Sequence, residues 1–134
     1  MNLRAAIAGT AVVGGAIATY LTVIHYSHIS PICTSGGCEK VQQSSYAMAG
    51  DIPVAVLGLA AYIAVSLTAA VRGVSAALSG AVIALAGAAF SGYLLWVQIA
   101  RIHAICQWCV GNDVVLVVVS VLCVARLLTE PEAA

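Results

Sequence analysis

Two pairs of cysteines are the residues in this sequence whose spacing suggests chemistry. Cys106 and Cys109 flank two residues in "ICQWC", and Cys33 and Cys38 flank four residues in "ICTSGGCEKV". A thiolate can attack a disulfide and exchange partners with it, so two pairs within reach of each other can pass electrons along. The CxxC spacing is equally common in zinc sites. The choice between these chemistries depends on the elements that position the two pairs.

The composition indicates a membrane protein. Of the 134 residues, 63% are hydrophobic and only 7% are charged, whereas an ordinary soluble domain is about 25% charged. Five acidic and five basic residues cannot form a water-facing surface on a chain of this length. We therefore expect residues 1–134 to form one domain in a lipid bilayer. The formal net charge of zero gives no indication of a nucleic-acid partner.

Uncharged stretches predict four membrane-spanning helices. A helix needs about 20 mostly apolar residues to cross the hydrocarbon core. The first stretch is longer than the roughly 7–15 apolar residues of a signal peptide, so we interpret it as a span. Pro53 suits the first turn of the second helix, where its missing N–H does no harm. The sequence predicts an all-α, four-transmembrane-helix bundle with a loop or cap at residues 27–52 and spans at residues 5–26, 53–71, 75–99 and 107–126.

The number of spans places both cysteine pairs on one side of the membrane. One pair follows the first helix and the other begins the fourth, so two spans separate them. Basic residues favour the cytoplasmic side. The side of the termini carries three of them, Arg4, Arg72 and Arg126. The side of the cysteines carries two, Lys40 and Arg101. This predicts a multi-pass protein of the cytoplasmic (inner) membrane with extracytoplasmic cysteines, where disulfides persist.

The two pairs lie in different local settings. Positions i and i+3 are neighbours on a helix, so Cys106 and Cys109 can form a disulfide or face a shared target. Free N–H groups at a helix N-terminus stabilise a thiolate, which favours Cys106 as the exchanging sulfur. Cys109 is one turn deeper. Cys33 and Cys38 lie in "PICTSGGC", whose proline, glycines and small polar residues are typical of a flexible loop. Pairs at two depths suggest a relay from protein thiols to a molecule in the lipid.

A four-cysteine metal site is the alternative interpretation. The wider pair is at the upper limit of the usual ligand spacing, and a closed zinc site would not explain the position at the membrane edge. His25, His28 and His103 could join such a site, but each also suits an interfacial helix end. We therefore expect no metal. Cys123 has no partner in the pattern and suits apolar packing.

One acidic residue falls within the fourth predicted span. Asp113 follows Cys109 by four residues and shares its helix face. An acid at membrane depth is costly and is therefore a candidate for function, although Asp113 could also be hydrated near the interface. Asn112 and Gln98 are weaker candidates.

Three segments resemble the vitamin K epoxide reductase family. They are "CTSGGCEKVQQSSYA", "GDIPVAVLGLAAY" and "CQWC". The family pattern has a loop cysteine pair, then a serine six residues after the second cysteine, then an aromatic residue; here these last two are Ser44 and Tyr46. The resemblance covers nearly the whole chain. The short segment between Ser44 and the second span is similar to bacterial or archaeal members.

The resemblance implies a four-helix bundle around a quinone, with a cap formed by the loop. It implies that Cys33 meets a thioredoxin-fold partner, that Cys38 attacks Cys106, and that Cys109 faces the quinone. Ser44 would lie in the cap near the quinone.

Two further residues are candidates for quinone binding. Asp113 stands where animal members place a tyrosine that hydrogen-bonds a quinone carbonyl, and the asparagine of those members has no counterpart at the start of the second span. Trp108 could wall the quinone pocket, or it could join Tyr26, Tyr93 and Trp96 in an interfacial aromatic belt.

The implied function is that of a quinone-dependent thiol oxidase. It would re-oxidise a separate DsbA-like protein and so support disulfide bond formation in exported proteins, with menaquinone, ubiquinone or a vitamin K-type quinone as acceptor. One alternative is a reductase of such a quinone or its epoxide. A non-enzymatic alternative is a small four-helix exporter, which would need an intramembrane carboxylate; the centres of the first three spans have none.

Overall fold

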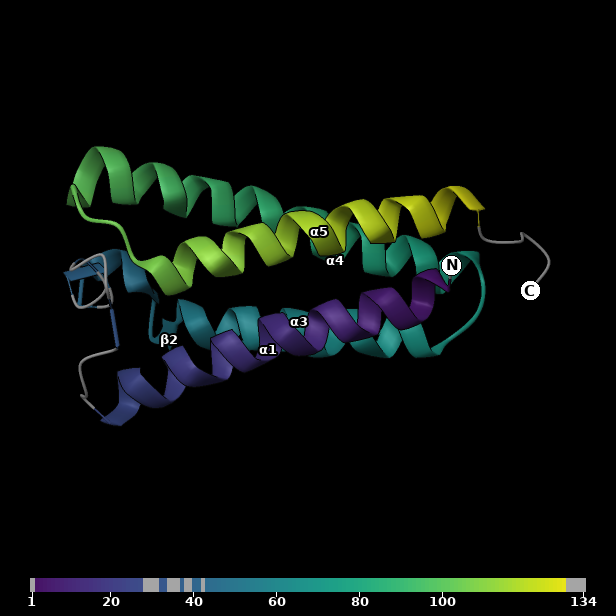
Figure 1. The fold of residues 1–134 in the computed structure, drawn as a ribbon, viewed down its shortest axis with the longest axis horizontal. Helices are drawn as coiled ribbons and strands as arrows, with labels where there is room; N and C mark the ends of the chain where they lie inside the picture. Colours follow the sequence, from purple (N-terminus) through teal and green to yellow (C-terminus); the bar gives the residue numbers. More distant parts are fainter. Residues whose placement is uncertain (1, 28–31, 34–36, 38–39, 42, 130–134) are drawn as a thin grey trace.

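The computed structural model describes residues 2–27, 32–33, 37, 40–41 and 43–129. This part of the chain contains four long α-helices. They are α1 (Leu3–Ser27), α3 (Val54–Ala70), α4 (Val74–Val97) and α5 (Gln107–Thr129). Helix α1 packs against α3 and α5, and α4 packs against the same two helices (Figure 1). The predicted all-α fold is confirmed.

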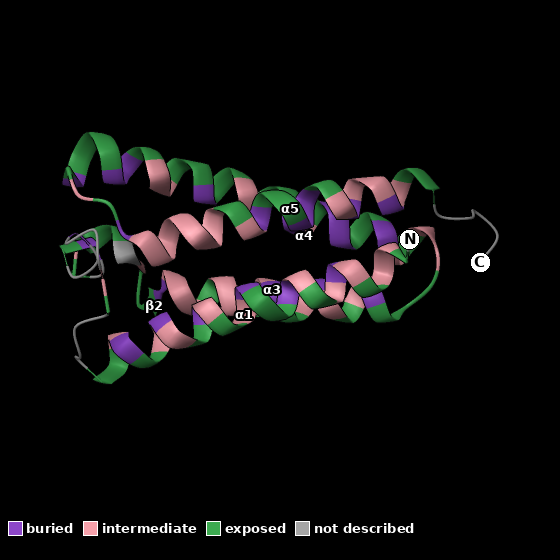
Figure 2. Ribbon diagram, viewed as in Figure 1, coloured by how far each residue is buried: buried purple, intermediate pink, exposed green. Residues whose placement is uncertain are grey.

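Three of these helices are long and apolar enough to cross a membrane. They are α1, α5, and α4 together with its continuation to Ile102. Helix α3 has 17 residues and falls short of that length, so its role as a fourth span stays a prediction. The outward faces are rich in apolar side chains, which suits contact with lipid tails (Figure 2). The most exposed include Val12, Val23, Leu67, Val82 and Val121.

Two arginines bind the carbonyl groups at the C-terminal end of α3. Arg4 of α1 donates from Nε to the carbonyl oxygen of Ala69 at 2.7 Å, and Arg126 of α5 donates from Nη1 to that of Thr68 at 2.8 Å. Arg4 also donates to the carbonyl oxygen of Ala70, and Arg126 also donates to that of Val71. The last carbonyls of a helix have no intrahelical partner and carry partial negative charge. The arginines therefore close this end of the bundle, next to the N-terminus (Figure 1).

A close contact between α1 and α3 depends on Gly14. A Cβ atom at this position would lie 2.3 Å from Cε1 of the Tyr62 ring, so any larger residue would displace that ring. Tyr62 is 2% exposed and belongs to the central core, which also includes Ile7, Ala11, Val65, Leu116, Val119 and Cys123. Small residues allow such close approach between membrane helices.

The end of α4 is irregular, and the irregularity positions the start of α5. After Val97 the helix widens into a π-helical turn, η2 (Gln98–Ile102). His103 then adopts a left-handed conformation with φ 57°, and the N–H of Ala104 donates to the carbonyl oxygen of Gln98 at 3.1 Å. A left-handed residue of this kind commonly ends a helix. The chain thereby reverses within a few residues and reaches Cys106.

The cap before α3 is a short ordered unit. It contains a 3₁₀ turn, η1 (Ser45–Ala47), and two antiparallel strands, β1 (Met48–Ala49) and β2 (Ile52–Pro53). Gly50, at φ 65°, forms the tight turn between the strands. Pro53 is the residue just before α3 rather than part of its first turn. The cap and the α4–α5 connection lie at the same end of the bundle, opposite the start of α1 and the end of α5 (Figure 1).

Candidate functional site

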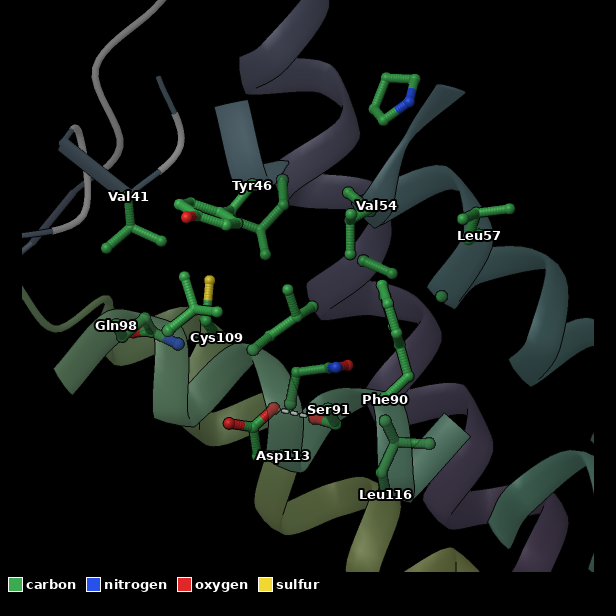
Figure 3. A pocket seen from close by; sticks show the side chains of 18 of the residues that line it. Val41, Tyr46, Val54, Leu57, Phe90, Ser91, Gln98, Cys109, Asp113 and Leu116 are labelled. Carbon is green, nitrogen blue, oxygen red and sulfur yellow. Dashed lines mark hydrogen bonds between the residues drawn. The ribbon is translucent and has the colours of Figure 1, made fainter. Parts of the chain in front are cut away.

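A cavity of about 190 Å³ lies among the helices at the cap end of the bundle (Figure 3). All four long helices and the cap contribute to its wall, and most of the lining is apolar. The side chains on the wall that can form hydrogen bonds or react are His25, Ser44, Tyr46, Ser91, Gln98, Cys109, Asn112 and Asp113. An apolar pocket with a few polar groups is typical of a small-molecule site.

The CxxC pair links this cavity to the α4–α5 connection. Cys106 is fully buried just before α5, and its sulfur accepts a hydrogen bond from the N–H of Cys109 at 3.3 Å. Its carbonyl oxygen accepts the N–H of Val110 at 3.0 Å. The sulfur thus lies where the side chain of a helix N-cap residue normally lies. Cys109, one turn later, lines the cavity.

The loop cysteine segment packs against the same region. Cys33 is disulfide-bonded, and it contacts the buried cluster formed by Val41, Val97, Ile102 and Cys106. Cys38 lies outside the described residues. Gly37 contacts the α4–α5 connection so closely that a Cβ atom there would lie 2.5 Å from the carbonyl oxygen of Ile105. The loop therefore reaches the residue that precedes Cys106.

Trp108 contacts the loop and is not among the residues that line the cavity. Its Nε1–H donates to the carbonyl oxygen of Ile32 at 2.6 Å, and its ring lies 4.8 Å from that of Tyr20. The N–H of Ile32 in turn donates to the hydroxyl of Tyr20 at 2.9 Å. Trp108 thus holds the residue before Cys33, and its role at a quinone stays a prediction.

Ser44 lines the cavity from the cap. It occupies the N-cap position of η1 but makes no side-chain capping bond; its hydroxyl donates instead to the carbonyl oxygen of Val41 at 2.7 Å. The oxygen of Ser44 still has acceptor capacity towards a molecule in the cavity.

Asp113 lies on the cavity wall and is hydrogen-bonded through one oxygen. The hydroxyl of Ser91 on α4 donates to its Oδ1 (Figure 3). Its Oδ2 is buried and has no hydrogen-bond partner in the described part of the chain. A buried polar atom without a partner is costly, so Oδ2 is suited to interact with a group in the cavity.

The neighbouring Asn112 is held by the core. Tyr62 donates its hydroxyl to Oδ1 of Asn112 at 2.7 Å. The sequence did not single out Tyr62 or Ser91, because isolated hydroxyl residues are common in membrane helices and carry no sign of their partner.

The chain matches one known protein family over most of its length. The model of the vitamin K epoxide reductase family matches residues 5–124. The chain belongs to the vitamin K epoxide reductase family. Members of this family are oxidoreductases, and their chemistry is linked to thiols and quinones. No match was found among curated proteins.

Membership of the vitamin K epoxide reductase family was predicted and is confirmed, and it favours redox chemistry over export. The three helices of spanning length and this family together indicate a membrane protein. The residues on the cavity wall fit a quinone, because its flat apolar ring suits the apolar lining and its two oxygens need a few polar groups. Cys109 places a sulfur on that wall.

The histidines occupy different positions in this member of the vitamin K epoxide reductase family. His25 lines the cavity, His103 is exposed in the α4–α5 connection, and His28 lies outside the described residues. Among the residues that are described, no three His, Cys, Asp or Glu side chains gather as metal ligands would.

Proposed function

We propose that the protein is a quinone-dependent thiol oxidase of the cytoplasmic membrane. It takes electrons from a separate thioredoxin-fold, DsbA-like protein and passes them through the Cys33/Cys38 pair and the Cys106/Cys109 pair to a membrane quinone. Its biological effect is disulfide bond formation in exported proteins. The observation that carries the proposal is the position of the CxxC pair, with Cys109 on the cavity wall and Cys106 packed in the cluster that Cys33 contacts.

The relay balances as three exchanges. The reduced partner gives two electrons and two protons to the Cys33–Cys38 disulfide and leaves oxidised. The Cys38 thiolate then attacks Cys106 of the Cys106–Cys109 disulfide, and Cys109 leaves as a thiolate. Attack of Cys33 on Cys38 releases Cys106 and restores the loop disulfide. When the CxxC pair closes again, it loses two electrons and two protons, which a bound quinone accepts to become a hydroquinone.

The local geometry suits Cys106 as the exchanging sulfur. The N–H of Cys109 points at its Sγ, and the N-terminus of α5 carries partial positive charge. Negative charge that develops on this sulfur is therefore stabilised where it forms. For a two-electron couple, about 30 mV corresponds to about 1.4 kcal/mol, so modest differences in potential drive each exchange.

A trapped intermediate tests the proposal. In Cys33→Ser, Cys38 has lost the neighbour that resolves its bond to Cys106, so a Cys38–Cys106 disulfide should accumulate in membranes that contain quinone. Non-reducing peptide mapping should find this link, and Cys109 should remain available for alkylation. The matched control adds Cys123→Ala to Cys33→Ser. Because Cys123 lies in the central core, its loss should leave the Cys38–Cys106 link unchanged. A Cys38–Cys109 link, or no link between the pairs, would contradict the proposed order.

The proposal also places both cysteine pairs on the extracytoplasmic side. The support is the basic end of the bundle, where Arg4 and Arg126 hold the last carbonyls of α3, because basic residues favour the cytoplasmic side. A membrane-impermeant maleimide should label the loop cysteines on intact, reduced cells. Labelling that requires a permeabilised membrane would reverse this orientation.

A further inference from the structure

Gln98 is a buried amide between the redox pair and the cavity. It is the first residue of the π-helical turn η2, it is 2% exposed, and it lines the cavity. Its carbonyl oxygen accepts the N–H of Ala104 at the end of that turn. Figure 3 labels its side chain and that of Cys109 among the residues of the cavity wall. An amide in the apolar end of a spanning helix requires hydrogen-bond partners.

One half of the Gln98 amide has such a partner. Its Oε1 accepts the backbone N–H of Cys106 at 2.8 Å. A backbone N–H can only donate, so the atom that faces Cys106 must be the oxygen, and the NH₂ group must lie on the other side of the amide. No hydrogen bond from this nitrogen is found within the described part of the chain.

The two serine hydroxyls on the wall donate their protons within the protein. The hydroxyl of Ser44 donates to Val41, and that of Ser91 donates to Asp113. A quinone carries two carbonyl oxygens that accept hydrogen bonds and has no donor of its own. The amide nitrogen of Gln98 is a donor on the wall that also carries Cys109. Asn112, whose oxygen accepts from Tyr62, offers a second amide on α5.

We propose that Nε2 of Gln98 donates a hydrogen bond to a carbonyl oxygen of the bound quinone while its Oε1 holds the backbone of Cys106. The inference rests on the proposed function and names a binding residue for it. A single side chain then fixes the distance between the quinone ring and the start of α5. Electron transfer places negative charge on the carbonyl oxygen, so the bond strengthens as the reaction proceeds and favours reduction.

Two substitutions separate the two halves of the amide. Gln98→Glu keeps an oxygen for the N–H of Cys106 and loses the NH₂ donor, whereas Gln98→Met loses both. Purified full-length protein in detergent would be assayed with dithiothreitol as electron donor and menadione as acceptor. We expect Gln98→Glu to lower kcat/KM for menadione about tenfold, the effect of one hydrogen bond to a charge-bearing group. Relative to wild type at each pH, the defect should grow as pH rises, because a protonated glutamic acid can still donate and a carboxylate cannot.

An infrared measurement gives a readout that a purely structural role would not change. With ¹³C-carbonyl menadione bound, one C=O stretching band should lie lower in the wild-type protein than in Gln98→Met, because a hydrogen bond weakens the C=O bond. Gln43→Glu makes the same chemical change at an exposed glutamine outside the cavity wall and should match wild type in every assay. Melting temperature and size-exclusion profiles identify any variant that fails to fold.

The outcomes are distinguishable. If Gln98→Glu retains wild-type kinetics at every pH while Gln98→Met loses activity with an unchanged carbonyl band, Gln98 only holds Cys106 and the inference is wrong. If both variants match wild type, it is also wrong. If wild-type protein itself does not oxidise dithiothreitol with menadione, the proposed function fails, whatever the variants do.

Discussion

The indole nitrogen of Trp108 donates a hydrogen bond to the carbonyl oxygen of Ile32 at 2.6 Å. Trp108 lies within the CxxC motif and Ile32 immediately precedes Cys33, so this bond joins the two cysteine segments across 76 positions of sequence. The hydroxyl of Tyr20 accepts a hydrogen bond from the N–H of the same Ile32. Trp108 thus contacts the loop rather than the cavity.

Trp108→Phe tests this assignment, because phenylalanine keeps an aromatic ring and loses the N–H. One neutral hydrogen bond contributes about 0.5–1.5 kcal/mol, so thiol exchange between the loop pair and Cys106 should slow about two- to tenfold, with an unchanged KM for menadione. Rapid alkylation of quenched samples measures the exchange. Trp96→Phe is the control, since Trp96 is exposed on α4 beside Arg101. A raised menadione KM in Trp108→Phe would instead place Trp108 at the quinone.

Ser44→Ala should slow menadione reduction severalfold, as expected for one hydrogen bond of about 0.5–1.5 kcal/mol. Ser44 lines the cavity, and its oxygen has acceptor capacity for a hydroquinone hydroxyl. The disulfide of Cys33 should form normally, which a gel-shift assay checks. Ser45→Ala, at the exposed neighbour outside the cavity wall, should have no effect. Equal turnover of both variants at limiting menadione would exclude Ser44 from the site.

Asp113→Asn should increase stability and decrease turnover. Asparagine preserves an oxygen for the hydroxyl of Ser91 and removes a carboxyl group that is costly within a membrane, so the melting temperature should rise. Quinone reduction requires protons, and a positioned acid or base commonly contributes about a hundredfold in rate; menadione turnover should therefore fall on that order. The control is Asp51→Asn, in the exposed turn of the cap. Unchanged turnover in Asp113→Asn would show that this carboxyl does not handle protons.

Gly14→Ala should destabilise the bundle by about 1–3 kcal/mol, the usual cost of overpacking. The new methyl group would overlap the Tyr62 ring, and the bond from Tyr62 to Asn112 would be disturbed. Gly9→Ala, in the same helix with nothing within 4 Å, should be neutral or slightly stabilising because alanine favours helix. Thermal unfolding in detergent, followed by circular dichroism, compares the two. Similar melting temperatures for both variants would mean that the contact at Gly14 is unimportant.

The sequence alone determined the class of the protein and the approximate limits of its helices. Charge-free length is a local property, and it sufficed to predict the stretches that became α1, α3, α4 and α5. The cysteine spacing and the number of intervening helices also come directly from the chain. The prediction was less complete at the end of α4, where the regular helix gives way to the π-helical turn that begins at Gln98, and no local pattern in the sequence indicated that change.

Only the tertiary structure decided which polar side chains share the cavity. In a soluble helix the apolar stripe shows which face is inside, but here the faces towards lipid and towards the core are both apolar, so the rotation of each helix about its axis cannot be derived from periodicity. The pairings of Ser91 with Asp113 and of Tyr62 with Asn112 each join two helices, and that of Gln98 with Cys106 joins η2 to the start of α5. They depend on how the helices pack against one another, and that is a property of the assembled bundle rather than of any one segment.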